Sequence, residues 1–135
     1  MTAKEYLTQY DSYKRKYKRC IIECKYEAEV LQEIKKYLNA FPAKNRRELE
    51  VKFRKCVVFC NDLKNRAQSY KDGMQEIRDV IESIPGLEGE ILKLRYIDGL
   101  IWEDVCDKVY YSWNKVLKSH NKALKMTEER LKTER

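Results

Sequence analysis

The sequence has few residues that break helices and lacks the motifs of common catalytic sites. Its 135 residues include 4 glycines, 2 prolines and 1 histidine. With 38% charged residues, this composition argues against a compact sheet protein and favours long, solvated helices. No glycine-rich phosphate loop, HExxH motif or nucleophile elbow occurs. The single histidine, His120, has no metal-type spacing around it, so we expect packing or a phosphate contact there. We expect neither an enzyme nor a cofactor.

The sequence has no long apolar run, and we expect no secretory leader. The first residues, Met1–Glu5, are polar, and the apolar run Val57–Cys60 is far shorter than the roughly 20 residues of a membrane-spanning helix. Five cysteines are an odd number, and without a secretory signal we expect reduced thiols. These features predict a cytoplasmic protein with no membrane partner.

Apolar residues recur in two long heptad stripes. Between residues 6 and 38 the stripe positions alternate steps of four and three, and only Glu27 interrupts them. Ala28, beside it, can partly cover that interruption. Between residues 49 and 84 the same alternation has no interruption. This period is typical of helices that bury one face against each other.

A turn separates the two stripes. Pro42 cannot continue the first helix and Asn45 can cap the second, so we expect the turn near residues 39–45. The sequence therefore predicts an antiparallel coiled-coil helical hairpin over residues 1–84. Gly73 lies in the second arm, where glycine costs about 1 kcal/mol relative to alanine. It marks either a soft point or a close approach of the two arms.

Residues 85–135 contain three short apolar segments with tight connections. The first starts after Pro85 and stops at Gly99, and the second recurs at helical spacing over residues 102–109. The third follows Ser112, a good N-cap, and turns Val116, His120, Ala123 and Leu124 inward. This order is that of a helix-turn-helix. The predicted fold is all-α, with the hairpin followed by a C-terminal three-helix helix-turn-helix domain.

Charge is divided within this C-terminal domain. Residues 86–107 hold 2 basic and 6 acidic side chains, whereas residues 108–125 hold 5 lysines and no acid. The third helix therefore suits the major groove of double-stranded DNA. Asn114 can pair with adenine and Lys115 with guanine; the alternative is that the lysines form a solvated helix face. The candidate DNA-binding residues are Ser112, Trp113, Asn114, Lys115, Lys118, Asn121 and Lys122.

The segment Leu94–Val105, LRYIDGLIWEDV, resembles the region 4 signature of sigma factors. Residues 112–124 look like the recognition helix of that family, and the whole plan is similar to phage and prophage late-gene regulators of the RinA/ArpU type. The resemblance implies a DNA-binding transcription regulator in a bacterial host cell, whose hairpin dimerises or contacts RNA polymerase. The chain differs from the family pattern at four positions, Ile101, Tyr110, Asn114 and Ser119. A capping Ser or Thr is usual at the first and glycine at the second.

Two further features lie in the hairpin. A second basic cluster, interleaved with tyrosines, can hold flanking phosphates or an acidic partner, although solvated flanks of the stripe are the slightly preferred interpretation. This cluster is Lys14, Arg15, Lys16, Lys18 and Arg19. Apolar residues beside the stripes widen the buried face and predict a third packing surface, either the C-terminal domain or a second copy. A homo-oligomer, in the simplest case a dimer, is expected.

Four cysteines form two i,i+4 pairs on the facing arms. They are Cys20, Cys24, Cys56 and Cys60. Four converging thiolates are able to ligate zinc tetrahedrally. All four nevertheless occupy stripe positions, where a small apolar side chain packs well. We therefore favour core packing and expect no metal.

Two other functions stay open. In the first, the four departures from the family pattern have moved the target from DNA to a protein, such as RNA polymerase or a host defence complex. In the second, the chain is a small DNA-packaging accessory subunit, which also uses helical DNA-binding domains and oligomers. Tight protein binding with sequence-blind DNA affinity favours the first, and a ring-sized oligomer favours the second.

Overall fold

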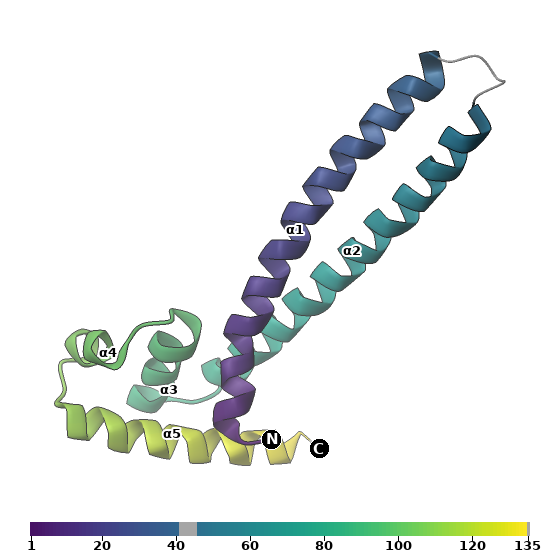
Figure 1. Cartoon of the computed structure of the whole chain (residues 1–135). Helices are drawn as coiled ribbons and strands as arrows, with labels where there is room; N and C mark the ends of the chain where they lie inside the picture. Colours follow the sequence, from purple (N-terminus) through teal and green to yellow (C-terminus); the bar gives the residue numbers. More distant parts are fainter. Residues whose placement is uncertain (41–45, 135) are drawn as a thin grey trace. The chain divides into compact units, whose positions relative to one another are not determined.

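The computed structural model describes residues 1–40 and 46–134, and those residues form helices joined by short connections (Figure 1). In chain order the helices are α1 (Ala3–Ala40), α2 (Arg46–Glu82), α3 (Gly86–Leu92), the π-helix η2 (Lys93–Ile97), α4 (Trp102–Val109) and α5 (Trp113–Thr133). The predicted fold class, a helical hairpin followed by a C-terminal helical domain, is confirmed. The expected turn at Pro42 and Asn45 lies outside the described residues.

The chain divides into two compact units. One consists of Met1–Lys14 with Asp72–Arg135, and the other of Arg15–Lys71. The unit that contains the predicted C-terminal domain therefore also includes the beginning of α1 and the end of α2. In the following we call these the terminal unit and the central unit.

In the central unit, α1 and α2 run antiparallel and pack along the two stripes. The buried residues there are Cys20, Cys56, Cys60, Leu63 and Ala67. Glu27 belongs to this seam, because the Cys56 thiol donates to the Glu27 carbonyl oxygen at 3.7 Å and to its carboxylate at 3.5 Å. Ala28 is exposed. The expectation that Ala28 covers the interruption is wrong, since heptad position and not polarity decides which side chain faces the other helix.

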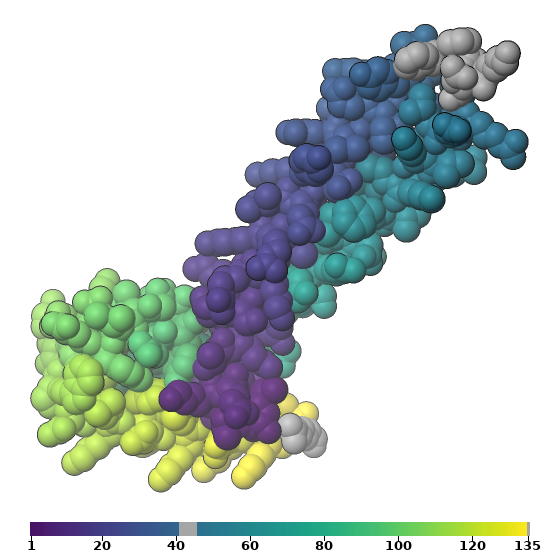
Figure 2. Space-filling view, viewed as in Figure 1, coloured from purple at the N-terminus to yellow at the C-terminus, as the bar shows by residue number. Residues whose placement is uncertain are grey.

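The terminal unit has two apolar cores. One joins α1, α2, α3 and α5 through Leu7, Tyr10, Ile77, Ile81, Ile84, Leu92 and Ala123. The other joins α3, η2, α4 and α5 through Ile91, Leu94, Val105, Val109 and Val116. The neighbouring residues Ile91 and Leu92 enter different cores, so α3 links the two. Figure 2 shows the N-terminal residues (purple) lying against the end of α5 (yellow).

A π-helix interrupts the helical period expected between Pro85 and Gly99. The Asp98 amide donates to the Lys93 carbonyl at 3.0 Å, and the Leu100 amide to the Leu94 carbonyl at 3.0 Å. These wide turns rotate the last residues relative to an ideal α-helix. Gly99, with φ of 71°, ends the segment as expected, whereas the π-helix itself leaves no signal in the spacing of the apolar residues.

Gly73 marks a close approach of α1 and α2. A Cβ atom at this position would lie 2.8 Å from Cε2 and 3.0 Å from Cδ2 of the Tyr13 ring. The glycine therefore makes room for an aromatic side chain of the facing helix. Five residues on, the Arg78 guanidinium donates to the Tyr10 hydroxyl at 2.6 Å through Nη2 and at 3.0 Å through Nε, so both tyrosines fix the pairing of the arms.

We predict that Gly73→Ala destabilises the protein although alanine is the better helix former. Displacing the Tyr13 ring costs more than the roughly 1 kcal/mol gained in helix propensity, so urea unfolding should show a net loss of about 1 kcal/mol. In a Tyr13→Ala background the same substitution should instead stabilise by about 1 kcal/mol. An equal stabilisation in both backgrounds would contradict the close approach.

Candidate nucleic-acid interface

The predicted helix-turn-helix corresponds to α4, a three-residue connection and α5. Helix α4 begins after Ile101, whose extended backbone occupies the N-cap without a side-chain hydrogen bond. Ser112 caps α5, because its hydroxyl accepts a hydrogen bond from the Lys115 amide at 3.3 Å. The predicted cap of the third helix is thus present. The Ile101 side chain has no hydrogen-bonding group, so it cannot cap the first amides of α4.

Helix α5 has one buried and one exposed face. The buried residues are Val116, Ser119, His120, Ala123 and Thr127. Ser112 and the other candidate DNA-binding residues are all exposed. At about 100° per residue, five of them fall within an arc of about 120° opposite the buried face. These five, which we call the α5 polar arc, are Asn114, Lys115, Lys118, Asn121 and Lys122.

Two lysines of the α5 polar arc have neighbours within the terminal unit. Lys122 forms an ion pair with Glu88 of α3, with Nζ and Oε1 3.5 Å apart. The Lys115 ammonium lies 5.9 Å from the centre of the Tyr111 ring. Lys118 makes no ion pair within residues 1–40 and 46–134. A polyanion can therefore contact Lys115 and Lys118 directly, whereas contact with Lys122 requires its ion pair with Glu88 to break first.

Tyr110 ends α4 in a left-handed conformation, with φ of 59° and ψ of 35°. Within residues 1–40 and 46–134 it is the only residue other than glycine with positive φ. Its side chain is 91% exposed, so little packing offsets the crowding of its Cβ atom. This backbone explains why glycine is usual here in the family that the sequence resembles.

We predict that Tyr110→Gly raises the free energy of unfolding by about 1 kcal/mol, because glycine adopts this conformation without strain. Tyr110→Ala is the matched control. It removes the ring but keeps the Cβ atom, and so it should gain almost nothing in thermal or urea unfolding. Equal stabilities of the two variants would show that the strain is absent.

His120 is packed in the interior of the terminal unit. Only 6% of it is exposed, and its Nε2 shares a hydrogen bond of 2.8 Å with the Tyr96 hydroxyl. The Trp102 ring meets the imidazole edge-on, with centroids 4.6 Å apart and planes at 71°. Burial, followed by the charges of Lys4 and Arg95, lowers the pKa of His120 to about 4. The neutral imidazole therefore packs here and does not face a phosphate.

This environment makes stability sensitive to acid. Because the pKa of His120 is about 4 in the folded state and about 6.5 in an unfolded chain, the unfolded state binds the proton more readily. The contribution of neutral His120 to the free energy of unfolding is complete above pH 6.5. It should be lost as the pH falls towards 4, and the loss should be on the order of 3 kcal/mol. His120→Gln removes this titration, so the difference between the two stability profiles isolates it. An NMR titration midpoint near 6.5 would contradict the prediction.

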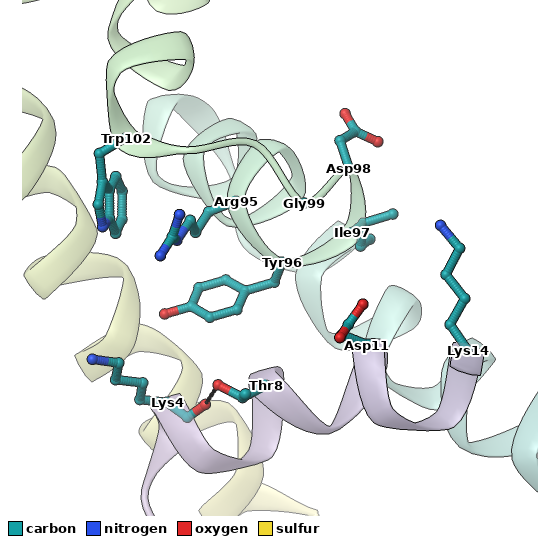
Figure 3. Close-up of a pocket in the computed structure, with 10 residues that line it drawn as sticks. All are labelled: Lys4, Thr8, Asp11, Lys14, Arg95, Tyr96, Ile97, Asp98, Gly99 and Trp102. Atoms are coloured by element: carbon teal, nitrogen blue, oxygen red, sulfur yellow. Dashed lines mark hydrogen bonds between the residues drawn. The ribbon is translucent and has the colours of Figure 1, made fainter. Parts of the chain in front are cut away.

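A cleft of about 540 Å³ lies beside this cluster, between the beginning of α1 and the segment from η2 to α4 (Figure 3). Its polar lining includes Lys4, Lys14 and Arg95 together with Asp11 and Asp98. The Arg95 guanidinium lies over the Trp102 ring, 4.7 Å from its centre, and donates to the Leu100 carbonyl at 2.9 Å. Sequence reasoning missed this cleft, since nothing in the chain order indicates that residues 4–14 lie beside residues 95–102.

The second basic cluster is divided between the two units. Lys14 lines the cleft of the terminal unit, whereas the other four residues belong to the central unit and are exposed. Lys16 lies over the Tyr70 ring, with Nζ 5.9 Å from its centre. This contact supports the interpretation of the cluster as a flank of the packed stripe.

The four cysteines of the hairpin are free thiols in the seam. Burial, and then the hydrogen bond to Glu27, raises the pKa of Cys56 to about 11. Burial also raises the pKa of Cys24. Within residues 1–40 and 46–134, no three His, Cys, Asp or Glu side chains converge as metal ligands do.

No protein-family model matches the chain, and no curated protein or solved structure is significantly similar to it. The likeness to sigma region 4 therefore rests on the residues of segment 84–124 alone. Among the helices of residues 1–40 and 46–134, none has the length and apolar character needed to cross a membrane.

Proposed function

We propose that the protein is a DNA-binding transcription regulator of the phage and prophage type, which places α5 in the major groove of duplex DNA. The observation that carries the proposal is the α5 polar arc, with three lysines and two asparagines exposed and the opposite face buried. Residues 108–125 hold no acidic side chain. Such a surface gains affinity by displacing the counterions of the phosphate backbone.

Contacts along α5 then differ in role. Asn114 and Lys115 lie in the first turn, where a helix inserted by its N-terminus reaches base edges, and their carboxamide and ammonium suit adenine and guanine. Lys118 and Asn121, one and two turns further on, follow the phosphates. Lys122 contributes less, because DNA must first replace its ion pair with Glu88. The Ser112 hydroxyl accepts a hydrogen bond in the cap and can still donate its own hydrogen to a phosphate held at the N-terminus of α5.

The hairpin supplies the second part of the proposal. Large apolar side chains of the central unit are exposed, namely Ile22, Tyr26, Tyr37, Val51, Val58 and Phe59. Burying them against a second copy or against RNA polymerase would remove this apolar surface from water. A dimer would also present two copies of α5 to two half-sites, which fixes their spacing.

A protein-interaction module is the second candidate. It is favoured by the exposed apolar side chains around α4, where Ile101 is 58% and Tyr110 91% exposed. Residues of this type are common in protein interfaces. A protein that binds RNA polymerase tightly and all DNA sequences equally weakly would fit this candidate and not the first.

We predict that Lys115→Ala and Lys118→Ala each weaken duplex binding about five- to tenfold at physiological salt. Each should also reduce the slope of log affinity against log salt by about 0.9, the share of one phosphate contact. Lys122→Ala should have a smaller effect. The measurement is fluorescence anisotropy over a salt series, with duplexes taken from a selected binding site and from random sequence.

Lys35→Ala is the matched control. It removes the same charge from an exposed position in the central unit, and it should bind DNA as the wild type does. If Lys35→Ala weakens binding as much as Lys115→Ala, the affinity reflects net charge alone. In that case, or if the wild type does not bind duplex DNA, the placement of α5 in the groove is wrong.

A further inference from the structure

Three aromatic residues are exposed where α4 passes into α5. Tyr110 is 91%, Tyr111 50% and Trp113 51% exposed. We call these three residues the aromatic turn. Lys108 precedes it and Lys115 follows it, and the Lys115 ammonium lies 5.9 Å from the centre of the Tyr111 ring. Aromatic surface and positive charge are thus interleaved within eight consecutive residues.

The backbone of the aromatic turn is unfavourable for the residue that it carries. Tyr110 adopts φ of 59°, a conformation that glycine tolerates best. A tyrosine that packed on its own protein could offset this strain, but the side chain is almost fully exposed. Packing against the described residues of the terminal unit therefore does not account for an aromatic ring at this position.

The exposed rings of the aromatic turn suit one part of a nucleic acid, the face of an unpaired base. In a duplex the faces of the bases are stacked on one another, so an exposed ring finds no partner there. An unpaired base offers its face, and stacking on an aromatic side chain strengthens binding about 5- to 150-fold for each base. The neighbouring lysines can hold the phosphates of the same strand.

We propose that the aromatic turn binds unpaired bases of a single-stranded segment that adjoins the duplex held by α5. This inference rests on the proposed function, and it narrows the target from any duplex to DNA with a locally open strand. The acidic residues Glu103, Asp104 and Asp107 of α4 are exposed and repel phosphates. The strand therefore continues along the lysine-bearing α5 and not across α4.

The test compares three DNA probes with one shared sequence. They are a fully paired duplex, the same duplex with a central unpaired bubble, and the isolated single strand. The wild type should bind the bubble more tightly than the paired duplex. Tyr110→Gly, which relieves strain and keeps the fold, should weaken bubble binding about tenfold and leave duplex binding unchanged. Lys35→Ala, at an exposed position of the central unit with no assigned role, should change neither.

Tryptophan fluorescence gives a second readout that a purely structural effect would not move. The sequence has two tryptophans, and Trp102 is half-buried between Arg95 and His120. Stacking of a base on Trp113 should quench the exposed fluorophore when the bubble or the single strand is added. Trp113→Phe keeps an aromatic face and should retain bubble binding, but the quenching should disappear.

The outcomes separate this inference from the proposed function. If Lys115→Ala weakens duplex binding while Tyr110→Gly binds every probe as the wild type does, the groove placement stands and the inference is wrong. Equal affinity of the wild type for paired and bubble DNA also overturns the inference. If the single strand is bound through the aromatic turn but the duplex is not bound at all, the groove placement fails and the stacking site stands.

Discussion

Burial of one face of α5 is the constraint on which the terminal unit depends. Ala123 enters the core shared with α1, α2 and α3, and Val116 enters the core shared with α3, η2 and α4. Helix α5 thus takes part in both cores, and each core fixes the rotation of the helix about its own axis. Because of this, the polar arc with Lys115 and Lys118 faces outward and is not free to turn inward.

Between these apolar groups lies a polar cluster, in which the Tyr96 hydroxyl shares a hydrogen bond with a neutral His120 beside Trp102 and Arg95. Its buried groups are satisfied, and they tie η2 and α4 to α5. The same arrangement disfavours a second proton on the imidazole, because burial and two nearby cations lower the pKa of His120. The loss of stability that we predict in acid follows from this packing of His120.

Much of the fold follows from the sequence because the heptad alternation is long and regular. Over the described residues the stripe of α2 is buried or half-buried from Leu49 to Ile84, and Ser112 caps α5 as its residue type indicates. Two features of the structure do not follow from the sequence pattern. The spacing of apolar residues indicates neither the π-helix η2 nor the contact of Glu27 with Cys56, which joins two helices.

The sequence by itself determined the all-helical class, the two stripes, the helix-turn-helix order and the exposure of the α5 polar arc, since each depends on residues within one or two helical turns. Only the tertiary structure decided that the buried His120 is neutral, that Lys122 pairs with Glu88, and that Tyr110 carries a strained backbone. The first two depend on segments far apart in the chain that folding brings within hydrogen-bond or ion-pair distance. The strained backbone of Tyr110 belongs to the tight connection between α4 and α5.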